Sequence, residues 1–143
     1  MLRSKQKKIS SQYLLFIGAM VMLSWPFIST FGPVIEGKFL PVVVDTVLTK
    51  TISEGKSQTI IYGSSTRDRD CTFSYLEWFY GNSDGSVLLP LEILEKPKIR
   101  DDGVFDFGPW RVGLEESLVK SQSFAIVYHQ CHPFWKTQTK FWP

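Results

Sequence analysis

The 27 residues between Lys8 and Glu36 include no charged side chain, and this run constrains the chain more than any other feature. As a helix rising about 1.5 Å per residue, residues 9–35 would reach about 40 Å, against a bilayer hydrocarbon core of about 30 Å. Trp25 suits the membrane interface, where amphipathic rings settle. We therefore predict a transmembrane signal-anchor helix over residues 9–35, which Pro26 kinks or ends.

Charges on either side of this segment predict its orientation. Four basic residues precede it: Arg3, Lys5, Lys7 and Lys8. Because the basic flank of a membrane helix stays in the cytoplasm, residues 1–8 are a predicted cytoplasmic tail. Residues 36–41 then form a predicted stalk, and residues 42–143 an exported domain. We expect a single-pass protein of the cytoplasmic (inner) membrane, with its C-terminal domain periplasmic or extracellular.

A cleaved signal peptide is the competing interpretation, because a basic segment followed by an apolar one also begins exported proteins. Cleavage requires small residues before the cut. The candidate site at residues 30–32 is followed by Pro33, which disfavours cleavage. We therefore expect the helix to remain attached.

Composition indicates a folded module without charge-driven affinity for nucleic acid. The chain contains 11 Phe, 5 Trp and 5 Tyr, more apolar surface than a disordered chain carries. After residue 8, 12 Lys and Arg stand against 14 Asp and Glu, so we expect no basic face for phosphates. Residues 103–108 lack the spacing of a glycine-rich phosphate loop, and no nucleotide partner is expected.

Short alternating segments separated by turns predict an all-β domain. The predicted strands cover residues 42–52, 58–62, 71–80, 87–93, 104–114, 124–132 and 135–142. Such strands in about 100 residues fit an antiparallel β-sandwich, whose two sheets cover each other's apolar faces; a small barrel is the alternative. Residues 63–70 and 96–103 are predicted loops. Pro90 predicts an edge strand, Gly108-Pro109 a bulge, and 124–132 the central strand.

The arrangement of cysteines and aromatic residues over residues 41–143 resembles an immunoglobulin-like domain. Cys71 falls in the third strand, Cys131 in a late central strand, and aromatic residues lie between them. Trp78 departs from the pattern, because it follows Cys71 by only seven residues, whereas the core tryptophan is expected on the next strand. The order of basic tail, anchor and two-cysteine sandwich is also similar to small uncharacterised membrane-anchored proteins of bacteriophage and bacterial genomes. These resemblances imply a fold and a topology, and no activity.

Two cysteines in an exported module most often form a disulfide. A bridge between Cys71 and Cys131 would close 60 residues and stabilise the domain by about 4 kcal/mol. The alternative is a zinc site, for which His129, Cys131, His132 and Cys71 supply a suitable ligand set. Strand alternation places His129 and His132 on opposite faces, so we expect the disulfide and no metal.

Catalytic patterns are missing from the sequence. There is no G-x-S-x-G, and the paired carboxylates at residues 101–102 and 115–116 lack apolar flanks that would raise a pKa. The last strand carries aromatic residues on both faces, and Trp142, opposite Trp135 and Phe141, is the predicted contact residue. We expect a non-enzymatic module without a cofactor that binds an unidentified protein partner. An exported metal-binding protein, or a small envelope enzyme, is the alternative.

Overall fold

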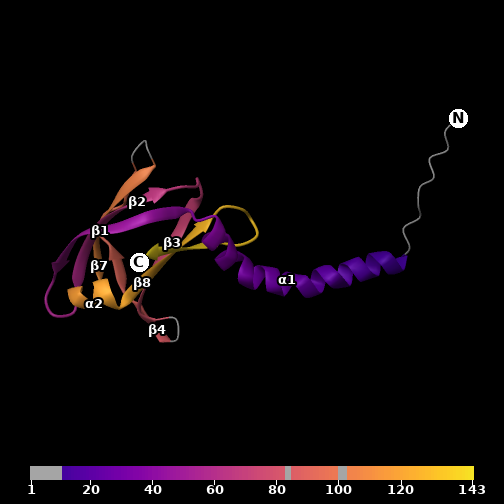
Figure 1. The fold of residues 1–143 in the computed structure, drawn as a ribbon, viewed down its shortest axis with the longest axis horizontal. Helices are drawn as coiled ribbons and strands as arrows, with labels where there is room; N and C mark the ends of the chain where they lie inside the picture. The colour runs from indigo at the N-terminus through magenta and orange to yellow at the C-terminus, as the bar shows by residue number, and fades with distance from the viewer. Residues whose placement is uncertain (1–10, 83–84, 100–102) are drawn as a thin grey trace.

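A computed structural model describes residues 11–82, 85–99 and 103–143 of the chain. One long helix, α1 (Ser11–Phe39), projects away from a β domain (Figure 1). By length and composition, its segment Gln12–Phe39 could cross a membrane. The helix continues through Pro26 and Pro33 and ends only where it meets the β domain. The predicted stalk is therefore wrong over residues 36–39, because helix extends through most of it.

Two antiparallel sheets make up the β domain, and the predicted β-sandwich is confirmed. The strands are β1 (Val43–Ser53), β2 (Thr59–Arg67), β3 (Thr72–Asn82), β4 (Gly85–Leu89), β5 (Leu91–Ile93), β6 (Lys98–Ile99), β7 (Val104–Val112), β8 (Ser123–Gln130) and β9 (Thr137–Trp142). The first sheet has the order β1-β2-β7-β5, with β6 on β7, and the second has the order β4-β3-β8-β9. This is the A-B-E-D and C′-C-F-G order of immunoglobulin-like domains. A short helix, α2 (Glu116–Ser121), precedes β8.

Apolar side chains from both sheets meet in one core. Its buried members are Val43, Ile61, Trp78, Phe107, Trp110, Val112, Val119, Ala125, Val127 and Phe141. Trp78 on β3 is fully buried, and its indole N–H donates to Ser123 Oγ at 2.9 Å. β8 lies between β3 and β9, as predicted for the most apolar strand, and its alternate residues Ala125 and Val127 face the core.

The cysteine pair explains why Trp78 departs from the immunoglobulin-like spacing. Cys71 precedes β3 and Cys131 follows β8, and a disulfide joins them with their Cα atoms 4.6 Å apart. The predicted pair is therefore present, but it connects neighbouring strands of one sheet. In antibody domains the disulfide instead connects the two sheets, and the core tryptophan lies on the strand after the first cysteine. Here Cys71 and Trp78 belong to the same strand region.

Pro90 divides the strand predicted over residues 87–93. β4 ends before it in the second sheet and β5 begins after it in the first, so the chain changes sheets at this residue. Proline has no N–H to donate to a ladder, which favours such a break. Pro90 instead accepts a hydrogen bond on its carbonyl from Gly113 N, at 3.1 Å. Both pieces are edge strands, as expected of the undivided strand.

β2 is longer than predicted and includes residues 63–67 of an expected loop. Residues 63–66 pair with β7, and Ser65, which is buried, donates to Val44 O at 3.0 Å. The strand therefore continues because its hydroxyls find partners inside the sandwich. The predicted bulge is confirmed: Ile61 pairs with Trp110 but Gly63 with Phe107, which leaves an extra residue on β7 at Gly108-Pro109. Gly108 has a φ of 99°, which favours glycine.

Candidate functional site

The end of α1 packs directly on β9, backbone against backbone. A Cβ atom added to Gly37 would lie 1.7 Å from Gln138 O, a distance that no side chain tolerates. Five residues earlier in the helix, a Cβ on Gly32 would lie 3.0 Å from the ring of Trp135. The two glycines therefore allow the helix to approach the sandwich closely.

Between these glycines, the carboxylate of Glu36 collects hydrogen bonds from four side chains. Its Oε2 accepts from Trp135 Nε1 at 2.8 Å, Thr137 Oγ1 at 2.9 Å and His132 Nε2 at 2.9 Å. Its Oε1 accepts from both terminal nitrogens of Arg69, each at 3.1 Å. The Glu36 side chain is only 12% exposed. We call Glu36 and its four donors the joint.

The hydrogen bonds of the joint are consistent with an ionised Glu36 and a defined histidine tautomer. Donors that converge on a carboxylate favour its charged form. His132 Nδ1 accepts a hydrogen bond from Phe134 N at 3.2 Å, which assigns the ring proton to Nε2, where it is donated to Glu36. Arg69 also donates to Leu40 O at 2.8 Å, so it satisfies a carbonyl beyond the end of α1.

Three segments that are distant in the sequence meet at the joint. Glu36 comes from α1, Arg69 from the connection between β2 and β3, and the other donors from residues 132–137 around the start of β9. The disulfide lies beside them, because Cys71 follows Arg69 by two residues and Cys131 immediately precedes His132. The bridge therefore braces both connections that hold the helix.

The residues of the alternative zinc site are separated in this structure. His132 is hydrogen-bonded to Glu36. His129 is instead buried in the sandwich, 6% exposed, with its ring edge-on to that of Phe73. Burial lowers the pKa of His129 to about 4. Cys71 and Cys131 are bonded to each other. Within residues 11–82, 85–99 and 103–143, no group of three His, Cys, Asp or Glu is placed to hold a metal ion.

The last strand differs from its prediction at both tryptophans. β9 begins at Thr137, so Trp135 precedes the strand and lies on α1 at the joint, not in the core with Phe141. Trp142 is half-buried against the core, and its indole N–H donates to Val119 O at 3.4 Å. Trp142 is therefore held by the fold and only partly exposed, and its role as the contact residue stays a prediction.

A different set of apolar residues lies on the outer side of the second sheet. We call it the aromatic face, and its members are Tyr75, Phe79, Phe124, Ile126 and Tyr128. Alternation turns Phe124, Ile126 and Tyr128 away from the core, and none of the three is fully buried. Phe79 stacks on Phe124 with ring centroids 5.0 Å apart, and Tyr75 stacks on Tyr128 at 4.3 Å. Burial, followed by a hydrogen bond with Glu77, raises the pKa of Tyr128.

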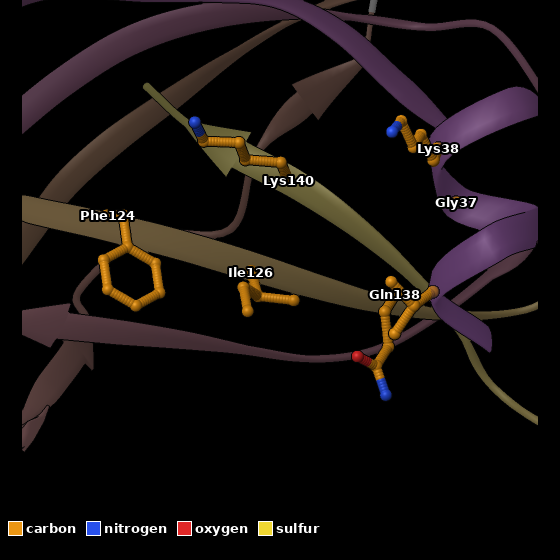
Figure 2. Close-up of a pocket in the computed structure, with 7 residues that line it drawn as sticks. Gly37, Lys38, Phe124, Ile126, Gln138 and Lys140 are labelled. Carbon is orange, nitrogen blue, oxygen red and sulfur yellow. The ribbon is translucent and has the colours of Figure 1, made fainter. Parts of the chain in front are cut away.

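A groove of about 340 Å³ separates the aromatic face from the end of α1. Figure 2 shows the residues that line it: Val34, Gly37 and Lys38 from α1, Phe124 and Ile126 from β8, and Gln138 and Lys140 from β9. The groove therefore combines an apolar floor with two positive charges.

No family model, curated protein or solved structure matches the chain. The geometry of the joint and of the aromatic face therefore carries the functional argument. Sequence patterns did not indicate Glu36, Arg69 or Thr137 as functional residues. One signal pointed to Glu36, which is the first charged residue after the long uncharged run. No local signal pointed to Arg69 or Thr137.

Proposed function

We propose that this protein is a single-pass membrane protein that holds a non-enzymatic β-sandwich outside the cytoplasm for contact with another protein. The observation that carries the proposal is the joint. A flexible stalk would let the domain rotate, whereas a largely buried carboxylate with four donors and the close approach at Gly37 fix the domain to its helix. A fixed domain presents the same face at the same height above the membrane.

The chain's charges support the direction of insertion. Four basic residues precede the helix, and the positive-inside rule keeps them in the cytoplasm. The sandwich then lies on the opposite side of a cytoplasmic membrane, a compartment in which a disulfide persists. The resemblance to small anchored proteins of bacteriophage and bacterial genomes supports the same topology.

The aromatic face and its groove are the surface we propose for the contact. Large rings contribute much of the energy of protein interfaces, and this face presents two stacked aromatic pairs. Lys38 and Lys140 flank the apolar floor of the groove. A partner segment that combines apolar side chains with carboxylates complements both properties.

Photocrosslinking of the full chain in native membranes tests this surface. A photoreactive residue at Gln138, in the groove, should form an adduct of defined mass with one partner protein. The matched control is the same residue at Lys56, in the turn between β1 and β2. Equal labelling from both positions, or no protein adduct from position 138, would refute the proposed surface.

The charge of the groove is tested with the partner so identified. Lys140→Glu should weaken its binding to the purified full chain by about tenfold or more, since a like-charge contact replaces an attractive one. Lys56→Glu makes the same change of charge far from the groove and should leave the affinity unchanged. Equal effects of the two variants would show that net charge, and not the groove, determines binding.

A further inference from the structure

The connection between β8 and β9 extends along α1 away from the sandwich, and in Figure 1 its yellow loop projects beside the helix. Phe134 in this connection is 65% exposed, and its ring contacts Trp25 edge-on with centroids 6.4 Å apart. Trp25 lies 14 residues before Phe39, about 20 Å along the helix axis. The ring of Phe134 therefore lies between the joint, whose His132 and Trp135 rings have centroids 5.6 and 6.2 Å from it, and the level of Trp25.

The position of Trp25 agrees with the outer boundary of a bilayer. A hydrocarbon core of about 30 Å takes about 20 helical residues. Counted from Ile9, the first residue after the basic tail, these residues end at Ile28. Trp25 is then at the level where tryptophan is enriched, and the rest of α1 rises through the headgroup layer. Phe134, which touches Trp25, lies close to this level.

Several backbone groups of this connection are hydrogen-bonded within it, which lowers the cost of placing it near hydrocarbon. Phe134 N donates to His132 Nδ1 at 3.2 Å, and Pro133 has no N–H. The side-chain amide of Gln130 donates to Trp135 O at 3.1 Å and also to His132 O. The exposed residues at its end, Pro133 and Phe134, are both apolar. We call these two residues the tip.

We infer that the tip is a second membrane contact, seated among the phospholipids of the leaflet from which α1 emerges. This inference rests on the proposed anchoring by α1 and adds a second lipid-binding element to it. The contact between Trp25 and Phe134, which are both exposed, joins the apolar surface of α1 to the tip. His132 and Trp135 flank the tip and are both bonded to Glu36, so the tip is held at this depth.

Crosslinking to lipid tests the inference on the full chain in nanodiscs of phosphatidylcholine and phosphatidylglycerol. The photoreactive p-benzoylphenylalanine replaces Phe134 in one sample, Phe16 of α1 in a second and Val87 of β4 in a third. These positions are matched in exposure, at 65%, 64% and 63% respectively. We expect lipid adducts in the intact mass from positions 134 and 16, and none from position 87.

The other outcomes separate the inference from the proposal beneath it. A lipid adduct from position 16 but none from position 134 would overturn the membrane contact of the tip and leave the anchor in place. An absence of lipid adducts from both positions would overturn the anchor itself. Equal adducts from positions 134 and 87 would also overturn the inference, because the contact would then not be specific to the tip.

Discussion

Removal of the Glu36 carboxylate should loosen the helix from the sandwich and destabilise the fold. Removing one partner of a buried ion pair typically costs about 3 to 5 kcal/mol, because the other partner stays buried without compensation. Here four donors lose their acceptor, but Arg69 and His132 are partly exposed, so water replaces part of what they lose. We therefore expect Glu36→Ala to lower the free energy of unfolding by about 3 kcal/mol, at the low end of that range.

Unfolding of the full chain in detergent micelles measures this loss. Tryptophan fluorescence is a suitable signal, because Trp78 is in the core and Trp135 donates directly to Glu36. For a domain of about 100 residues, a loss of about 3 kcal/mol lowers the midpoint of thermal unfolding by roughly 12 to 24 °C. Glu36→Gln keeps an acceptor oxygen but turns amide N–H groups toward other donors. Its loss of unfolding free energy should therefore be smaller than that of Glu36→Ala, but still measurable.

Glu54→Ala is the matched control, because it removes a carboxylate from an exposed ion pair. Glu54 Oε2 lies 2.6 Å from Arg111 Nε, and surface pairs of this kind contribute little to stability. The midpoint of thermal unfolding of Glu54→Ala should stay close to that of the unmodified chain. If Glu36→Ala lowers the midpoint no more than Glu54→Ala, the joint does not fix the domain, and the reasoning behind the proposed function fails.

Three further predictions concern the disulfide, a buried histidine and the topology. The intact mass should rise by two hydrogens on reduction of the Cys71–Cys131 bridge, with a loss of about 4 kcal/mol in stability; two thiols that alkylate before reduction would contradict the pairing. Because burial lowers the pKa of His129 from 6.5 to about 4, the unfolded chain binds a proton between these pH values that the folded chain does not. Stability should therefore fall by up to about 3 kcal/mol as pH drops through this window. His129→Phe should remove this part of the pH dependence of the urea unfolding midpoint. An unchanged pH profile in this variant would exclude His129 as the source of the pH dependence. A C-terminal reporter that works only outside the cytoplasm should be active, and activity confined to a cytoplasmic reporter would reverse the predicted topology.

Local periodicity predicted the elements whose surroundings follow from their own residues. The apolar run predicts α1, and the alternation in residues 124–130 predicts β8 with its buried and outward faces. The predicted ends of strands were less accurate where pairing with a neighbouring strand decides how far a strand extends. β2 continues through polar residues because β1 and β7 supply their hydrogen bonds, which the residues of β2 alone do not reveal.

The candidate site was harder to predict, because an aromatic residue does not by itself indicate what it will touch. Trp135 and Trp142 were placed by alternation along one continuous strand, but β9 begins two residues after Trp135. That single difference moves Trp135 from the core to the joint. The joint depends on contacts across 33 to 101 residues of sequence, and no pattern within a short window specifies which distant donor meets Glu36.

The chemistry of the joint fits a role in fixing the orientation of the domain better than it fits a role in attachment alone. A buried ion pair adds little to stability compared with well-packed apolar residues, and in some proteins buried polar groups instead fix one arrangement among several. Apolar packing of α1 on β9 would permit rotation about the helix axis. Directional hydrogen bonds to Glu36 from two segments of the sandwich oppose that rotation, and the backbone contact at Gly37 opposes sliding along β9. Since both constraints act on the helix end nearest the groove, they set the orientation of the aromatic face directly.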